Sequence, residues 1–210
     1  MCGIVGYWDK CGADASLVEQ MAQKIQSRGP DDSGVWLNEE NSLALAHRRL
    51  AIIDLSPAGR QPMASSSGRF TLVFNGEIYN HQALRADLEH ECGNFGWQGH
   101  SDTETLLHGF DKWGIEITIK KTIGMFAIAV WDNKEKTLTL IRDRMGEKPL
   151  YYGWQGSALL FGSELSALKV YPKFTADINR QALCLLMRQG FISAPYTIYE
   201  GIQKLLPGTM

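Results

Sequence analysis

The chain has 210 residues, which is enough for one domain or for one domain and part of a second. Lysine and arginine total 21 against 23 acidic residues, and these scattered charges, net −2, exclude the basic surface on which nucleic acid or anionic lipid would bind. No apolar run approaches the roughly 18 residues of a membrane span, and Asp9 and Lys10 interrupt the N-terminal one, so we expect neither a membrane segment nor a signal peptide.

Strands dominate the elements expected in the first half. Residues 2–9 predict a buried strand, and residues 16–26 carry apolar side chains at helical spacing behind Asp14 and Ser16 as candidate caps. The glycines and proline of residues 27–34 indicate an ordered turn. Four short strand candidates follow, at 34–37, 42–47, 49–54 and 69–74.

The second half adds helices and two hairpins. Helices are predicted after Asn80 and after Asp102 or Thr103, the second ending near Gly114. The hairpin strands are expected at 125–132, 137–143, 149–154 and 158–163, followed by a short helix at 164–169. Beyond a boundary near 172–177 the pattern changes to a helix at 179–189, closed by Gly190, and an irregular tail. These elements predict an α+β fold in which helices cover packed antiparallel sheets.

Cysteine and histidine spacing gives no sign of a metal site. The cysteines are Cys2, Cys11, Cys92 and Cys184, which show neither CxxC spacing nor an accompanying histidine pair and are too sparse for a disulfide framework. We therefore expect no metal in this chain and a reducing, cytoplasmic location. No catalytic role is expected for the scattered histidines, which are His47, His81, His90, His100 and His108.

Cys2 is the candidate nucleophile. If Met1 is removed, Cys2 carries both a thiol, with a reference pKa of about 8.5, and an α-amine, with a reference pKa of about 7.7, so the amine can accept the thiol proton. The alternative is a small apolar residue in a first strand.

Asn75 and Gly76 follow an apolar segment and could stabilise an oxyanion. A side-chain amide and the next backbone N–H can point at one spot, and glycine allows close approach. The dipeptide alone favours a hairpin turn, because Asn-Gly between strands is a strong turn signal, although a helix rather than a strand is expected to follow.

Charged residues offer candidate contacts to a substrate. Arg48 and Arg49 precede an expected strand, where a guanidinium could bind a carboxylate through two parallel hydrogen bonds; a solvated charge is the alternative. Asp102 could hold an ammonium group, and an N-cap role would explain it as well. A further run is most simply a solvated or ion-paired loop, and consists of Arg142, Asp143, Arg144 and Lys148.

Together these features resemble a known family. The N-terminal cysteine is followed, in order, by SRGPDDSG, LAHRRLAIID, LVFNGEIYNH, HSDTETLL, GMFAIAVWD and RDRMGEKPLYY. This pattern resembles the glutaminase domain of glutamine-hydrolysing asparagine synthetases, a class II glutamine amidotransferase domain of the N-terminal-nucleophile hydrolase superfamily. The resemblance implies a four-layer αββα sandwich, with two antiparallel sheets between helices, over residues 2–172. RGPDDSG and NGEIYNH favour the asparagine-synthetase branch over its sister branches.

The resemblance also implies a role for each candidate residue. Cys2 would be the nucleophile and Asn75 and Gly76 the oxyanion hole, while Arg49 would hold the α-carboxylate of glutamine. Asp102, with help from Glu77, would hold the α-ammonium. The backbone of four further residues would line the pocket, namely Leu50, Ala51, Ile52 and Ile53. The implied reaction releases ammonia and then hydrolyses a γ-glutamyl thioester.

Residues 173–210 resemble a linker and only the first segment of the synthetase domain, and the SGGxDS pyrophosphate loop is absent from the sequence. We therefore expect a truncated chain, with ATP and Mg²⁺ bound only by a synthetase domain that follows in cis and that aminates an acceptor carboxylate, aspartate first of all. Four alternatives stay open: a sugar-carboxylate acceptor in polysaccharide assembly, an amidase for other amides, a non-catalytic regulatory domain, and a homodimer.

Overall fold

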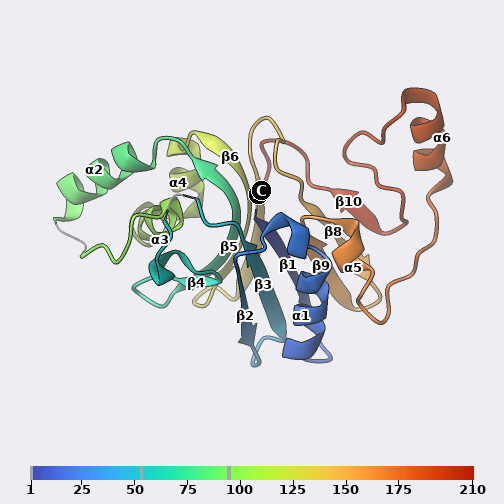
Figure 1. Cartoon of the computed structure of the whole chain (residues 1–210), viewed down its shortest axis with the longest axis horizontal. Helices are drawn as coiled ribbons and strands as arrows, with labels where there is room; N and C mark the ends of the chain where they lie inside the picture. Colours follow the sequence, from blue (N-terminus) through green and yellow to red (C-terminus); the bar gives the residue numbers. More distant parts are fainter. Residues whose placement is uncertain (1, 53, 94–95) are drawn as a thin grey trace.

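The computed structural model describes residues 2–52, 54–93 and 96–210, and its strands form two antiparallel sheets (Figure 1). The larger sheet has the order β10-β8-β9-β1-β3-β2 and the smaller the order β4-β5-β6-β7. The strands of the larger sheet are β1 (Gly3–Trp8), β2 (Asp32–Asn38), β3 (Leu43–Arg49), β8 (Tyr151–Gln155), β9 (Ala158–Gly162) and β10 (Ile202–Lys204). Those of the smaller sheet are β4 (Met63–Ala64), β5 (Phe70–Ile78), β6 (Gly124–Asp132) and β7 (Thr137–Arg142).

Helices cover the outer face of each sheet. On the larger sheet lie α1 (Ala15–Gln23) and α5 (Leu165–Leu168), and α1 begins at the predicted cap, since the Asp14 carboxylate accepts a hydrogen bond from Ser16 N at 2.8 Å. On the smaller sheet lies α3 (Asp102–Trp113), which packs against α2 (His81–Cys92) and α4 (Ile115–Lys121). Helix α6 (Arg180–Gln189) stands at the end of the molecule opposite α2 (Figure 1). None of the helices in the described part of the chain is long and apolar enough to cross a membrane.

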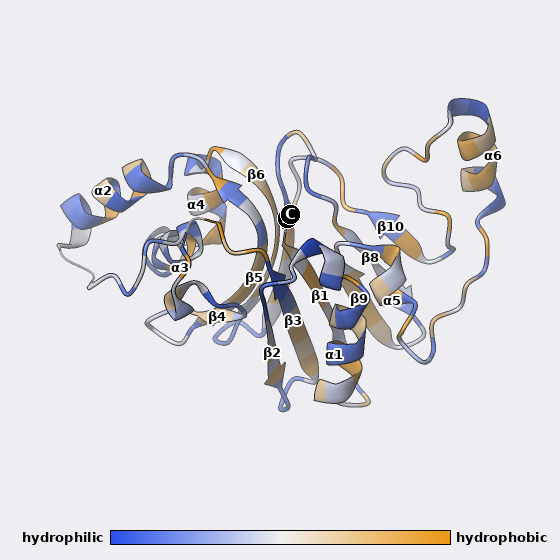
Figure 2. Cartoon of the chain, viewed as in Figure 1, coloured by the Kyte–Doolittle hydropathy of each residue, from blue (hydrophilic) through white to orange (hydrophobic). Residues whose placement is uncertain are grey.

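The core consists of three apolar layers, which follow from the alternation of side chains along each strand. In β3, Ala44 and Ala46 face α1, while Leu43 and Leu45 pack between the sheets. The smaller sheet contributes Val73 and Trp131 to that middle layer and places Phe74 against α3 and its neighbours. Figure 2 shows hydrophobic colour concentrated on central strands such as β3, whereas α2, at the outer edge, and β10 are coloured largely as hydrophilic. The order helix, sheet, sheet, helix confirms the predicted αββα sandwich.

The structure corrects two strand and turn predictions. The strand expected at 49–54 is wrong, because β3 ends at Arg49 and the backbone then leaves the sheet: Leu50 N donates to the Cys2 sulfur and Ala51 N to the Asp31 carboxylate. The hairpin-turn interpretation of Asn75-Gly76 is also wrong. Both residues lie inside β5, opposite residues 127 and 126 of β6.

The loop after β7 and the tail differ from expectation as well. Asp143 and Lys148 are 1% and 3% exposed, so the prediction of a solvated loop is wrong for them; the Asp143 carboxylate accepts backbone N–H groups that would otherwise be buried without partners. The tail is not wholly irregular, because β10 pairs with β8. The division into residues 2–172 and 173–210 stays a prediction.

Candidate active site

One cavity collects the predicted site residues from separate elements. Cys2 precedes β1, Arg49 ends β3, Asn75 and Gly76 lie in β5, and Asp102 begins α3; all five line the cavity. Leu50, Ile52 and Glu77 line it too. Ala51 does not, and Ile53 lies outside the described residues.

The position of Cys2 is fixed through both its side chain and its backbone. Its sulfur lies 3.4 Å from Leu50 N, which donates to it, and 3.6 Å from Leu50 O. Its carbonyl accepts a hydrogen bond from Arg28 Nε at 3.0 Å, and Arg28 is in turn paired with Glu164 at 3.1 Å. The half-buried Cys2 therefore lines the cavity immediately before β1.

Asn75 is a buried amide without internal partners. It is 1% exposed, and neither Nδ2 nor Oδ1 has a hydrogen-bond partner among the described residues. Because an unpaired buried polar group costs about 1–3 kcal/mol, its retention on the wall beside Cys2 points to a ligand that completes it. At the next position, a Cβ on Gly76 would lie 2.2 Å from the carbonyl oxygen of Met125, so only glycine fits this pairing of β5 with β6.

His47 is a residue whose place in the site the sequence did not reveal. It follows Leu43 and Leu45 on the inward face of β3, and its Nε2 lies 3.1 Å from the carbonyl oxygen of Phe74, immediately before Asn75. Burial lowers the pKa of His47 to about 4, so at neutral pH Nε2 carries the single proton and donates it to that carbonyl. His47 thereby connects β3, in the sheet that begins after Cys2, to β5, the strand that carries Asn75.

Of the two neighbouring arginines, only Arg49 reaches the cavity. Its Nη1 donates to Ser56 O at 3.1 Å and its Nη2 to Asp54 O, which leaves further donors of the guanidinium for a ligand. Arg48 instead donates to Gly29 O at 3.1 Å, outside the cavity. A guanidinium held in this way is suited to binding the carboxylate of a ligand.

Asp102 is a buried carboxylate in the first turn of α3. Ser101 is the cap, with its hydroxyl accepting from Glu104 N at 3.2 Å, so the N-cap interpretation of Asp102 is wrong. One oxygen of Asp102 accepts from Ile78 N at 2.9 Å. Burial raises the pKa of Asp102 to about 6, and the charge of Glu77 adds to the rise. Backbone hydrogen bonds oppose this rise, and a ligand ammonium group beside the carboxylate would oppose it further.

Lys148 is another wall residue that the sequence did not reveal. Its backbone N–H donates to Asp143 at 3.0 Å and its carbonyl accepts from Arg142 at 2.8 Å, so the loop that carries it is held on both sides. The only signal in the sequence was an unusual density of charge before an apolar strand.

Comparison with known proteins identifies the family and the fold. The model of the family described as "Glutamine amidotransferase domain" matches residues 1–210. Among solved structures, a glutamine phosphoribosylpyrophosphate amidotransferase from B. subtilis, complexed with ADP and GMP, shares the fold with a TM-score of 0.68 and 22% identity, over 80% of this chain and 43% of its own.

Curated relatives are longer than this chain. Asparagine synthetase [glutamine-hydrolyzing] 3 of Bacillus subtilis (strain 168) is 38% identical over 99% of this chain and 34% of its own length. Putative asparagine synthetase [glutamine-hydrolyzing] 2 of Methanocaldococcus jannaschii is 36% identical over 98% of this chain and 42% of its own. The chain thus spans between 34% and 42% of the length of these two relatives.

Proposed function

The chain belongs to the glutamine amidotransferase family, and from this premise we propose that it hydrolyses glutamine to glutamate and ammonia through the thiol of Cys2. The observation that carries the proposal is the unpaired, buried amide of Asn75 on the same cavity wall as that thiol. Arg49 and Asp102 in the same cavity match the α-carboxylate and the α-ammonium of an amino-acid substrate.

The proposed chemistry has two halves. Once Met1 is removed, the α-amine of Cys2 takes the thiol proton, and the thiolate attacks the side-chain amide carbon of glutamine to form a C–S bond. The amide nitrogen of Asn75 and the N–H of Gly76 stabilise the oxyanion, and the ammonium formed on Cys2 returns its proton to the departing ammonia. Water then attacks the γ-glutamyl thioester, which releases glutamate and restores the thiol.

Selectivity for glutamine would come from Arg49 and Asp102. An amide without the amino-acid head would leave a buried guanidinium and a buried carboxylate unpaired, and sites built in this way reject such analogues strongly. A preference for an amide that lacks these groups would instead favour the rival amidase.

In the whole protein, we propose that the ammonia passes to a synthetase domain in cis, because the relatives that share this segment are named asparagine synthetases. Aspartate is the proposed acceptor, and ATP and Mg²⁺ would be used there rather than in residues 2–172. A cytoplasmic location belongs to the same proposal, since a thiol nucleophile needs reducing surroundings.

The proposal is tested by measuring the intact mass of the chain after incubation with a glutamine-analogue diazoketone, with glutaminase activity assayed in parallel. We expect loss of Met1, one adduct located on Cys2 by peptide mapping, and ammonia release that needs neither ATP nor Mg²⁺. The Cys2→Ala variant should show neither adduct nor activity. A chain that has lost Met1 but stays unmodified and inactive would point to the non-catalytic regulatory domain.

A further inference from the structure

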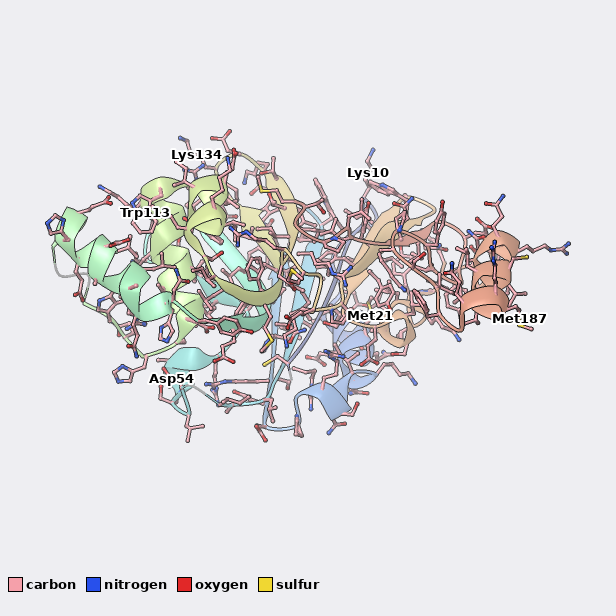
Figure 3. All side chains as sticks on the ribbon, turned by 90° about the horizontal axis from the view of Figure 1, so that it is seen from above. Lys10, Met21, Asp54, Trp113, Lys134 and Met187 are labelled. Carbon is pink, nitrogen blue, oxygen red and sulfur yellow. The ribbon has the colours of Figure 1, made fainter. Side chains whose placement is uncertain are left out.

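The carboxylate of Asp54 joins two loops that reach the cavity from different parts of the chain. Asp54 is 7% exposed and lies between β3 and β4, where Figure 3 labels it. Its Oδ1 accepts a hydrogen bond from Ser56 N at 2.8 Å, within its own turn. Its Oδ2 accepts one from His100 N at 2.8 Å, in the loop before α3.

The first loop orients the guanidinium of Arg49. Both backbone carbonyls that receive hydrogen bonds from Arg49 belong to this turn, at residues 54 and 56. The bond from Ser56 N to the Asp54 carboxylate closes the turn, so the same carboxylate fixes the two acceptors that hold Arg49.

The second loop leads directly to Asp102, two residues after His100. It passes so close to Asp54 that a Cβ on Gly99 would lie 2.5 Å from Oδ2. On its other side Glu104 accepts from Gln98 N at 2.7 Å and from Gly99 N at 3.1 Å. The loop is therefore held between two carboxylates. Hydrogen bonds, from Ser56 first of all, lower the pKa of Asp54 to about 2, so this carboxylate is ionised at neutral pH.

We infer that Asp54 is a positioning residue that sets the spacing between Arg49 and Asp102, and so determines selectivity for ligands that carry both an α-carboxylate and an α-ammonium group. This inference rests on the proposed function, which assigns those two groups to Arg49 and Asp102. Asp54 would act through the two loops rather than by touching the reacting atoms.

The test measures how well ligands protect Cys2 from alkylation by iodoacetamide. L-Glutamate carries both head groups, glutarate lacks the ammonium, and 4-aminobutyrate lacks the α-carboxylate. In Asp54→Asn only one side-chain oxygen remains to accept, so the hydrogen-bonded link that sets the spacing between the two loops is broken. We expect protection by glutamate to weaken at least tenfold. Protection by the two one-headed ligands, and the alkylation rate without ligand, should change less than about threefold.

Two further variants separate positioning from a general loss of structure. Gly99→Ala leaves Asp54 intact but forces the loops apart, so it should weaken glutamate protection in the same selective way. Asp9→Asn is the matched control, since Asp9 is also a buried carboxylate that accepts several hydrogen bonds, yet lies outside the cavity. Asp9→Asn should leave the protection of Cys2 by each of the three ligands unchanged.

Each failure has its own signature. If glutamate does not protect the wild-type chain, the proposed function is wrong. If glutamate protects the wild type but Asp54→Asn and Gly99→Ala keep its preference over both one-headed ligands, the positioning role is wrong. A uniform loss of protection by all three ligands, together with a changed alkylation rate, would overturn it as well.

Discussion

Asn75 lines the cavity, and its side-chain amide forms no hydrogen bond with the described residues. In Asn75→Ala we expect kcat for glutamine to fall by about 10²–10³, the usual effect of removing one oxyanion donor, with KM within a few fold of the wild type. The melting temperature should stay unchanged or rise, because the variant buries no unpaired amide. Steady-state kinetics and calorimetry test this together, and a large drop in stability would mean that Asn75 has a structural role instead.

Asp102 gives a pH-dependent prediction. Its folded-state pKa of about 6 lies above the ordinary value of 3.8, so the folded protein holds this proton more tightly than the unfolded chain does, and stability falls as pH rises from 3.8 to 6. Asp102→Asn keeps an oxygen that can accept from Ile78 N but has no charge to bury. We expect the variant to be more stable than the wild type at pH 7, by about 3 kcal/mol at most, and equally stable below about pH 4.

Denaturant titrations at pH 7 and pH 3.5 measure this difference directly. A wild type that is more stable than Asp102→Asn at pH 7 would show that the carboxylate already has a compensating partner. The variant should also lose protection of Cys2 by glutamate, and in the wild type that protection should weaken about tenfold per pH unit below pH 6, as Asp102 becomes protonated.

The sequence was informative about residues that line the cavity and silent about the residues that we infer to position them. Cys2, Arg49, Asn75, Gly76 and Asp102 could be predicted because together they form a recognisable pattern, and the structure brings them to one cavity. The roles inferred for Asp54 and His47 depend on contacts between β3, β5 and the loop before α3, which are distant in sequence. No local pattern reports such contacts.

At the scale of elements, β5 is the strand on which the site depends. Its residue Gly76 faces the backbone of β6 so closely that the added Cβ of Gly76→Ala would meet a backbone oxygen at 2.2 Å and Phe126 Cα at 2.7 Å. Since backbone cannot move aside as a flexible side chain can, we expect Gly76→Ala to lower the free energy of unfolding by about 1–3 kcal/mol. We also expect a marked loss of glutaminase activity.

The matched control for this substitution is Gly68→Ala, on the same side of the fold. Gly68 has a φ of +71° in an exposed turn, and its Cβ would meet nothing within 4 Å. Gly68→Ala should therefore lower the free energy of unfolding by about 1 kcal/mol, through backbone strain alone, and leave kcat unchanged. If Gly76→Ala is no worse than this control in either measurement, β5 and β6 can separate more easily than their register indicates.

The segments that were misjudged share a physical cause. Most of residues 49–54 are apolar, as in a strand, yet Ile52 is 71% exposed. Leu50 and Ile52 line the cavity, and the backbone N–H groups of Leu50 and Ala51 donate to the Cys2 sulfur and the Asp31 carboxylate instead of to a neighbouring strand. Asn75-Gly76 looks like a turn but lies inside β5, where the glycine allows the close approach of the β6 backbone. Hydrophobic periodicity predicted most strands and helices of the sandwich well, and the segments that line the cavity less well. Such segments commonly depart from local secondary-structure propensity.

At the scale of the whole molecule, the tail is joined to the wall of the cavity. The guanidinium of Arg142 donates to Leu205 O and Gly146 O, each at 2.6 Å, and to Lys148 O at 2.8 Å. Gly208 N donates to Asp143 O at 2.8 Å. The loop that carries Lys148 is therefore held from one side by the C-terminal segment, beyond the boundary predicted near 172–177.

These contacts predict that residues 178–210 and the sandwich unfold as one unit. Ending the chain at residue 177 would remove β10, expose the edge of β8 and release the loop after β7. Summing the burial of Ile202 and the lost hydrogen bonds, we expect a destabilisation of about 5 kcal/mol and a melting temperature lower by about 10–20 °C. Calorimetry of the two chains tests this, with a single transition expected for the full chain. Two transitions in the full chain, or a shortened chain that melts within a few degrees of it, would show instead that the boundary near 172–177 separates two independent folding units.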